Sequence, residues 1–376
     1  MTDWAKYRSL FPHVSQRIYL NHAGIAPFNL LGKAALLDFV EKRLDKDIEF
    51  WPAALEKKAY FVELIARFIH APRENIALVT NTSAGLNILT LGLSWKAGDR
   101  ILLNDFEFPS NVIPFTNLKR LGVEIDWVHH HDGILEIDEI RKKITPRTRI
   151  LSISMVEFIN GFRNDVKTLG KICREHGIIF SVDAIQALGA LKVDVEELGI
   201  DFMSSAGNKW LMWPAGLGFI YLSPRIFSEV YPAQAGWLSL QNPFDFFNYD
   251  QPFAPTAQRF EPGVFNTMGI MTAIPTLEMM LEIGIEAIEQ KVLSNSKFLI
   301  QLLKEHGFKI YSSTAEKHLS GIVTFFHPQA EQLYSFLKEQ QVYVSLREGK
   351  IRVSPHFYNN DNDLETFIKK VRGFKK

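Results

Sequence analysis

Short apolar segments recur along the first two thirds of the chain at nearly regular intervals. Each begins about 22 to 28 residues after the previous one, which is the length of one strand, one crossover helix and their loops. The segments are Ile76–Val79, Ile101–Leu103, Val123–Val128, Ile150–Ile153, Ile178–Val182 and Phe202–Ser204. This spacing predicts repeated βα units around a mostly parallel sheet.

Two further patterns belong to the same part of the chain. Val166–His176 places apolar residues at helical spacing and is followed by Gly177, a residue that helix C-caps favour. Leu217–Leu222 follows the preceding apolar run too closely for a crossover helix, so we predict an antiparallel strand in the same sheet. Together these patterns predict an α/β fold.

The last third of the chain changes character. Two long helical patterns are followed by strands of alternating polarity: Met268–Ile285, Ile288–His306, Gly321–Phe326 and Ile351–Ser354. Such a mixture is typical of a smaller α+β domain. We therefore expect a large domain over residues 16–265 and a small domain that combines residues 266–376 with residues 1–15.

Composition excludes several classes of protein. The chain has 376 residues, with 42 Lys plus Arg against 42 Asp plus Glu, so we expect no charged surface for nucleic acid or an anionic membrane. Its 47% hydrophobic and 22% charged residues are typical of a folded globular protein. We also expect neither export nor a membrane span, because residues 1–12 do not form a signal peptide and no long apolar run occurs.

Cysteine and histidine limit the chemistry further. Cys173 is the one cysteine, which excludes an internal disulfide and a Cys-rich metal site and favours a reducing, cytoplasmic location. His129–His131 stand together, but neighbouring side chains at a strand end point in different directions. We therefore expect no metal site there.

Polar residues follow three of the predicted strands, at the edge where open α/β sheets bind ligands. The first group is Thr80–Asn87, a hydroxyl-rich turn in which Gly85 opens a helix. Its backbone amides and the helix dipole would form a phosphate site. The alternative is an ordinary helix cap by Thr82 or Ser83, and the motif alone favours the cap.

The other two strand ends carry opposite charges. Asp183 and Gln186 follow Ile178–Val182, and Lys209 follows Phe202–Ser204. A buried carboxylate is costly unless a positive group faces it, so Asp183 and Lys209 form either a structural ion pair or part of a ligand site. The neighbouring phosphate-type turn favours the ligand site.

Ordered motifs from one end of the chain to the other resemble a known family. They are Tyr19–Gly24, Thr82–Gly85, Glu107–Asn111, Ser181–Gln186, Gly207–Lys209, Arg259–Gly263 and Arg352–Ser354. The chain resembles the class V, fold type I enzymes that depend on pyridoxal phosphate (PLP), which include cysteine desulfurases, selenocysteine lyases and isopenicillin N epimerase-like proteins. The resemblance implies a seven-stranded, mostly parallel sheet, an amino acid substrate and a homodimer with its active site near the subunit interface.

The resemblance also implies roles for the charged strand ends. Lys209 would form the Schiff base with the aldehyde of PLP and later move the α-proton of the substrate. Asp183 would keep the pyridine nitrogen protonated, so that the ring accepts electrons. Lys209 and Asp183 are therefore the expected catalytic residues, and Gln186 would bind the phenolic oxygen of the ring.

The phosphate site matches the family only in part. Ser83 and the amide of Ala84, with Thr82 nearby, correspond to phosphate-binding residues of the family. A family threonine that reaches the phosphate of the neighbouring subunit is replaced by Val264, and the Ser-Gly-His before the lysine becomes Ala206–Asn208. Phosphate binding is therefore expected to draw on one of three replacements: Ser205, Asn208 or Thr267.

Two aromatic replacements bear on the reaction. Phe108 lies where desulfurases of the family place a ring-stacking histidine, and Phe158 replaces an asparagine near the cofactor oxygen. A phenyl ring stacks as imidazole does but cannot move a proton. Phe108 therefore argues against a reaction that needs an acid or base on that face.

Substrate contacts are implied by the same resemblance. Arg352 matches the arginine that binds the substrate α-carboxylate, for which a guanidinium fork is suited; the alternative is a surface arginine on a strand. Arg347 would take a second carboxylate, and His22 would face the substrate. Desulfurases carry a cysteine before this arginine, but residues 342–351 contain none, and Cys173 fits a small buried apolar residue.

Three alternatives stay open. Transamination, epimerisation and lyase chemistry all use the same cofactor residues. A nucleotide-binding α/β protein without PLP is a second class, although no G-x-G-x-x-G follows the first strand and no G-x-x-x-x-G-K-[S/T] occurs. A catalytically silent PLP-fold binding protein is the third, and the presence of both Lys209 and Asp183 argues against it.

Overall fold

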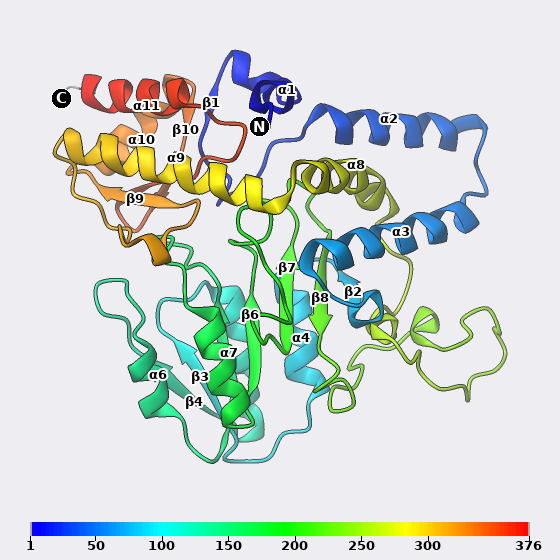
Figure 1. Ribbon diagram of the computed structural model, residues 1–376. Coiled ribbons are helices and arrows are strands. Elements are labelled where there is room, and N and C mark those ends of the chain that lie inside the picture. Colours follow the sequence, from blue (N-terminus) through cyan, green and yellow to red (C-terminus); the bar gives the residue numbers. More distant parts are fainter. Residues whose placement is uncertain (1, 375–376) are drawn as a thin grey trace.

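A seven-stranded sheet forms the centre of the protein in the computed structural model, which describes residues 2–374 (Figure 1). Its strands are β2 (Ile76–Val79), β3 (Arg100–Asn104), β4 (Glu124–Val128), β5 (Thr148–Ser154), β6 (Ile179–Asp183), β7 (Phe202–Ala206) and β8 (Gly218–Leu222). They lie in the order β2-β8-β7-β6-β5-β3-β4, and β8 is antiparallel to both of its neighbours while β3 to β7 are parallel. The predicted fold and the reversed strand are confirmed.

Both faces of the central strands β6, β7 and β8 are buried, whereas the edge strand β4 is partly exposed. Leu102 and Phe180 point into one apolar core, which α7 (Val166–Glu175) covers with Val166, Leu169 and Ile172. The alternate residues Ile101 and Ile179 point into a second core, which α4 (Thr82–Gly92) covers with Leu86 and Leu89. A sheet covered on both faces has strands that are apolar throughout, which is why the short apolar runs identified them.

Three helices pack together beside the sheet: α2 (Leu30–Asp45), α3 (Trp51–Ile69) and α8 (Thr267–Ile283) (Figure 1). The helix α8 begins at the expected domain boundary, yet its buried Ile270 and Leu277 belong to the same apolar core as Leu102. Among residues 2–374, no single helix is long and apolar enough to cross a membrane; α8 and α9 (Ile285–Glu305) reach that length and composition only together and meet at 83°.

The small domain has its own core. An antiparallel sheet of β11 (Ser345–Arg347), β12 (Lys350–Val353) and β9 (Val323–Phe326) packs against α9, α10 (Ala330–Glu339) and α11 (Asp361–Gly373). Near the other end of the chain, β1 (Ile18–Tyr19) pairs in parallel with β10 (Val342–Tyr343), and Leu20 is buried in the small-domain core. Residues 18–20 therefore pack with the small domain.

Shorter elements complete the described chain: α1 (Trp4–Arg8), α5 (Ile113–Thr116), α6 (Ile137–Lys143) and 3₁₀ turns at Pro12–Ser15, Arg73–Asn75, Pro109–Asn111, Asn117–Leu121, Trp237–Ser239, Ala257–Phe260 and Glu316–His318. The parallel register aligns Ser154 with Asp183 and Asp183 with Ser204 at the carboxyl edge of the sheet. The small domain reaches this edge, because Arg352 on β12 contacts the loop after β5. A site formed at the edge therefore draws on both domains.

Candidate active site

The two charged strand ends are neighbours, but they do not neutralise each other. Asp183 ends β6 with 2% of its surface exposed, and its Oδ1 accepts a hydrogen bond from the Ile185 amide at 2.9 Å. Burial raises the pKa of Asp183 to about 6, while the Ile185 amide and Lys209 lower it. Burial lowers the pKa of Lys209 to about 8, and Asp183 opposes this shift. Within residues 2–374 the two groups form no ion pair with each other. Each is therefore free to bind a group of opposite charge on a ligand.

The hydroxyl-rich turn opens α4 beside β7. Asn81 caps the helix, because its Oδ1 accepts from the Ala84 amide at 2.9 Å. Thr82 Oγ1 accepts from the Ala206 amide at 3.1 Å, and Ser83 Oγ donates to Ser110 Oγ at 2.9 Å. The cap is thus neither Thr82 nor Ser83, and the Ala84 amide, expected to hold phosphate, is bonded to Asn81.

Close packing holds the start of α4 against the sheet. A Cβ atom on Gly85 would collide with the Ser204 side chain and with Ile220, so only glycine lets the helix approach β7 this closely. Ser204 Oγ donates to the Thr82 carbonyl at 3.0 Å. These contacts fix the first turn of α4 next to the strand that leads to Lys209.

Arg352 is a buried cation without an acidic partner. It is 1% exposed, and Nη1 donates to the Phe158 carbonyl at 2.6 Å while Nη2 donates to Ser345 Oγ at 3.3 Å. Its Nε is buried without a partner, and no ion pair involves Arg352 within the described range. Burial lowers the pKa of Arg352 to about 9, and Arg347 lowers it further. An uncompensated buried guanidinium is costly, so the position favours binding of an anion.

Comparison with known proteins assigns the family. The profile of the family "Aminotransferase class-V" matches residues 53–367, which include Asp183, Lys209 and Arg352. The chain belongs to the class V aminotransferase family. Enzymes of this family depend on PLP, and the family assignment inferred from the sequence motifs is confirmed.

Individual class V relatives cover most of the chain. An uncharacterized aminotransferase, YcbU of Bacillus subtilis, is 24% identical over 97% of this chain and 96% of its own length. A probable cysteine desulfurase of Pyrococcus abyssi is 30% identical over 81% and 80%. The apo cysteine desulfurase of Thermococcus onnurineus superposes with a TM-score of 0.90 at 25% identity, over 100% of this chain and 99% of its own. The cystine C-S lyase C-DES, bound to cysteine persulfide, shares the fold with a TM-score of 0.90 at 21% identity, over 97% and 100%.

Two expected cofactor contacts of this class V enzyme, Gln186 and Ser205, use their side chains within the protein, and a third, Asn208, is bonded there only through its backbone. Gln186 Oε1 accepts from the Trp210 indole at 3.0 Å, and its Nε2 donates to the Ala23 carbonyl at 3.1 Å; one hydrogen of Nε2 is left for a ring oxygen. Ser205 Oγ donates to the Ala206 carbonyl at 3.2 Å. The Asn208 carbonyl accepts from the Ala26 amide at 2.9 Å.

Two phenyl rings lie near Lys209. Phe108 and Phe158 meet edge to face with centroids 5.2 Å apart, and Lys209 Nζ lies 5.7 Å from the centroid of Phe108. Phe108 is 42% exposed, so one part of the ring is open for contact. This placement fits a ring that covers a cofactor bound at Lys209.

His22 and Arg347 occupy opposite environments. His22 is fully buried, with Nε2 at 3.1 Å from the Tyr358 hydroxyl and Nδ1 at 3.4 Å from the Ser354 carbonyl, and burial holds its pKa well below the usual range. These contacts occupy both ring nitrogens. Arg347 ends β11 at the surface, yet its charge lowers the pKa of both Lys209 and Arg352. Their roles toward a substrate stay predictions.

The neighbouring histidines His129 and His130 hydrogen-bond to an acid, and the sequence motifs left three buried or capping residues unrecognised. His129 and His130 both contact Asp105 through Nδ1, at 2.7 and 2.8 Å. Sequence reasoning missed the cap Asn81 and two buried acids, Glu107 and Glu157. Glu107 stands in a quoted motif, but nothing in the local sequence reveals that both carboxyls are buried together.

Proposed function

We propose that this class V enzyme attaches PLP to Lys209 and acts on an amino acid whose α-carboxylate binds Arg352. The observation that carries the proposal is the buried, acid-free guanidinium of Arg352, whose charge lowers the pKa of Lys209. A site that holds an amine nucleophile and a buried guanidinium without an acidic partner suits a substrate with an amino group and a carboxylate on one carbon.

The residues at the sheet edge fit the parts of PLP. Lys209 Nζ would hold the aldehyde carbon, and the carboxylate of Asp183 would keep a proton on the ring nitrogen. Ser83 and the amides at the start of α4 other than that of Ala84 would hold the phosphate, and Phe108 would cover one face of the ring. Bound PLP supplies an electron sink for a bond broken at the substrate α-carbon.

The site favours reactions without an enzyme-bound persulfide. Residues 342–351 contain no cysteine, and burial strongly raises the pKa of the Cys173 thiol, which makes this thiol a poor nucleophile. Phe108 also offers no acid or base on its side of the site. Transamination, epimerisation or C–S bond cleavage with release of the sulfur product fits these residues, and product analysis separates the three.

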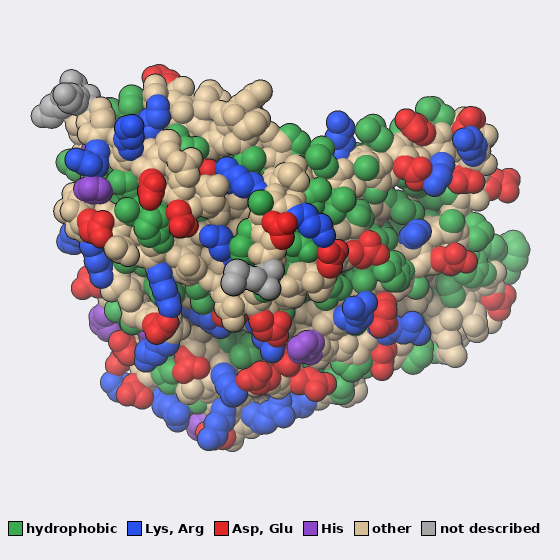
Figure 2. Space-filling view, turned by 45° about the horizontal axis from the view of Figure 1, so that its top comes forward, with side chains coloured by type: hydrophobic (Ala, Val, Ile, Leu, Met, Phe, Trp, Pro, Cys, Tyr) green, Lys and Arg blue, Asp and Glu red, His purple; other side chains and the backbone are tan. Residues whose placement is uncertain are grey.

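A homodimer completes this proposal. Exposed apolar side chains include Val264 at 70% and Met268 at 56%; Val264 also lines a cavity of about 540 Å³ together with Ala84 and Asn87 of α4. Leu44, Phe246 and Phe247 are exposed as well, and Figure 2 shows hydrophobic side chains at several places on the surface. We propose that a second copy covers the surface around Val264. Light scattering should then give twice the mass of the chain, and a monomeric holoenzyme would contradict the dimer.

Incubation with amino acids tests the proposed function directly. Purified protein should show the visible absorbance of bound PLP, which should change on adding an amino acid substrate. Keto acid, inverted amino acid and released sulfide are measured in the same samples, with Lys209→Ala as the control for background PLP chemistry. Absorbance that no amino acid alters, together with no product, would refute the proposed activity.

A further inference from the structure

Two glutamates are buried together where the large domain meets the small one. Glu107 follows β3 and immediately precedes Phe108, and Glu157 follows β5 and immediately precedes Phe158. Their exposed fractions are 8% and 1%. Within residues 2–374 neither carboxyl forms an ion pair, whereas the buried Glu261 pairs with a lysine. The two acids are therefore buried without a cation.

The hydrogen-bond donors around the two carboxyls are unequal. Glu107 Oε1 accepts from the Ser154 amide at 2.6 Å and from Asn104 Nδ2 at 2.8 Å, and its Oε2 accepts from Ser154 Oγ at 2.5 Å. Glu157 Oε1 accepts from Asn164 Nδ2 at 3.0 Å and from the same Asn104 Nδ2 at 3.4 Å. Its Oε2 is buried without a partner. Three donors suit a carboxylate at Glu107, and the bare oxygen suits a neutral acid at Glu157.

The surrounding charges favour the same distribution. Burial raises the pKa of Glu107 to about 7 and raises the pKa of Glu157 well above its ordinary range. Glu107 raises the pKa of Glu157, and Asp183 on β6 raises both. Neither Lys209 nor Arg352 is among the main influences on the pKa of the two glutamates, whereas Lys209 lowers the pKa of Asp183.

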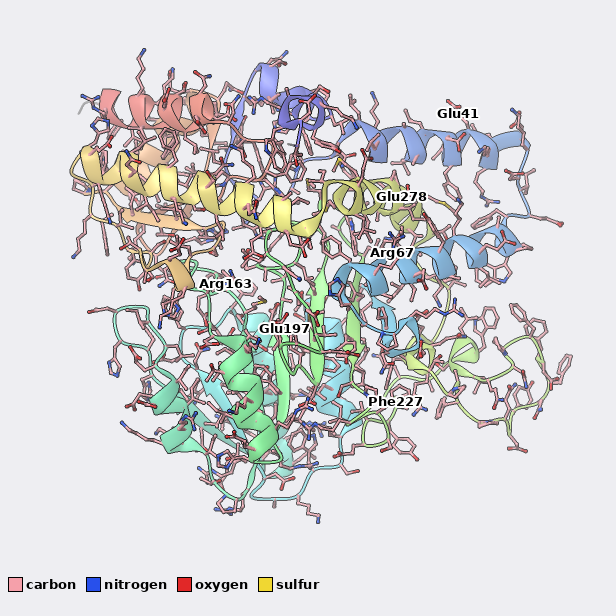
Figure 3. All side chains as sticks on the ribbon, in the orientation of Figure 1. Glu41, Arg67, Arg163, Glu197, Phe227 and Glu278 are labelled. Atoms are coloured by element: carbon pink, nitrogen blue, oxygen red, sulfur yellow. The ribbon has the colours of Figure 1, made fainter. Side chains whose placement is uncertain are left out.

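Glu157 lies at the base of a loop that joins the two domains. Its amide donates to the Phe162 carbonyl and its carbonyl accepts from the Gly161 amide, both at 2.9 Å. Small-domain side chains bond to the carbonyls of four successive loop residues, 158 to 161: Arg352, Thr324, Ser312 and Ser320. Arg163, two residues after Gly161, pairs with Glu289 of α9 at 2.8 Å; it lies at the junction of the domains (Figure 3). Displacement of Glu157 would therefore displace the carbonyl that holds Arg352.

We propose that Glu157 carries a proton on Oε2 while Glu107 is ionised, and that this neutral acid beside a carboxylate positions the Phe158 carbonyl for Arg352. The proposal rests on the proposed role of Arg352 in substrate binding. Loss of the proton leaves two negative charges that share one amide donor without a cation, and the repulsion is relieved by moving the loop. Glu157 is thus a positioning residue, and the substrate affinity of the enzyme depends on its proton.

Infrared difference spectroscopy of the substrate-free protein tests whether Glu157 carries a proton. At about pH 8, where ordinary glutamates are ionised, the wild-type protein should show the C=O stretch of a buried neutral carboxylic acid. The band should be absent in Glu157→Gln and unchanged in the control Glu56→Gln, which changes an exposed glutamate. Absence of the band in wild type, or its persistence in Glu157→Gln, would overturn the proposal whether or not the protein turns over any amino acid.

Substrate affinity tests the positioning role. Glu157→Gln keeps a neutral side chain and should hold the KM within about twofold, whereas Glu157→Ala should raise it about tenfold or more with unchanged PLP absorbance. The wild-type KM should rise at the pH where the infrared band disappears, and the Glu157→Gln KM should not. A purely structural role would lower the melting temperature of both variants and leave KM unchanged, which contradicts positioning. The infrared test stands even where Glu157→Ala does not fold.

Discussion

Arg352 Nη1 donates to the carbonyl oxygen of Phe158 at 2.6 Å, across the boundary between the two domains. The bond aims a buried guanidinium at the edge of the sheet where Asp183 and Lys209 lie. Nη2 is held by Ser345 Oγ, while Nε has no partner. The small domain therefore contributes one prepositioned cation to a site whose other parts belong to the large domain.

Replacement of Arg352 should remove most of the substrate affinity. A bidentate, charge-assisted pair contributes a few kcal/mol, so Arg352→Ala should raise the KM for an amino acid about a hundredfold. Arg352→Lys keeps the charge but loses the planar fork, and it should be almost as damaging. Steady-state kinetics at constant PLP occupancy measure both variants.

Arg347→Ala is the matched control for this prediction. Arg347 is exposed, so its removal should change the KM far less than removal of Arg352. Should Arg347→Ala show the larger loss while both Arg352 variants bind amino acids normally, the carboxylate site lies at Arg347 and Arg352 has a structural role.

The lowered pKa of Lys209 predicts how PLP binding depends on pH. Only the neutral amine attacks an aldehyde, and a pKa of about 8 leaves about a tenth of the amine neutral at pH 7. The rate of PLP capture by the apoprotein should therefore rise with pH and level off just above pH 8, as followed by stopped-flow absorbance. A rate that keeps rising tenfold per pH unit up to pH 10 would show an ordinary, solvated lysine.

The cap of α4 is a separate test of the phosphate end. Asn81 Oδ1 satisfies the Ala84 amide, and loss of a cap typically costs about 1 kcal/mol. Asn81→Ala should lower the free energy of unfolding of the PLP-free protein by about that amount and should weaken PLP binding. Denaturant unfolding and PLP titration measure the two effects. Unchanged values for both would show that Asn81 supports neither the helix nor the phosphate site.

Cys173 should be dispensable for chemistry. It is buried on α7 in the apolar core that packs against the sheet. Burial raises the pKa of its thiol, so little reactive thiolate is present. Cys173→Ser should keep turnover close to wild type, measured at a temperature where the variant is folded. Persulfide transfer that is robust in wild type and lost in this variant would contradict the absence of a persulfide route.

The sequence predicted those features that depend on local pattern. The strands Ile179–Asp183 and Phe202–Ala206 are buried on both faces, so their apolar runs are visible in the sequence, and their parallel order places Asp183 near Lys209. Pairing of Ile18 with Val342 joins residues that are distant in the chain, and no local periodicity encodes it. This is why residues 18–20 were expected with the large domain.

The sequence did not reveal which polar groups are buried or which hydrogen bonds they form. The expected donor at Ala84 is bonded to Asn81, because the residue before the first helical turn, rather than a hydroxyl within it, has the extended backbone of a cap. Glu157 showed no motif, since its environment is made by Asn104 at the end of β3 and Asn164 in the loop before α7. Only the folded chain brings these groups together.

Borohydride reduction of the holoenzyme followed by peptide mass mapping tests the central claim most directly. Reduction fixes PLP to the lysine that holds it. We predict that the pyridoxyl group is found on the peptide that contains Lys209 and that Lys209→Ala protein carries no such label. Stoichiometric labelling of a different lysine, or amino acid turnover by Lys209→Ala at the wild-type rate, would contradict the assignment of this site.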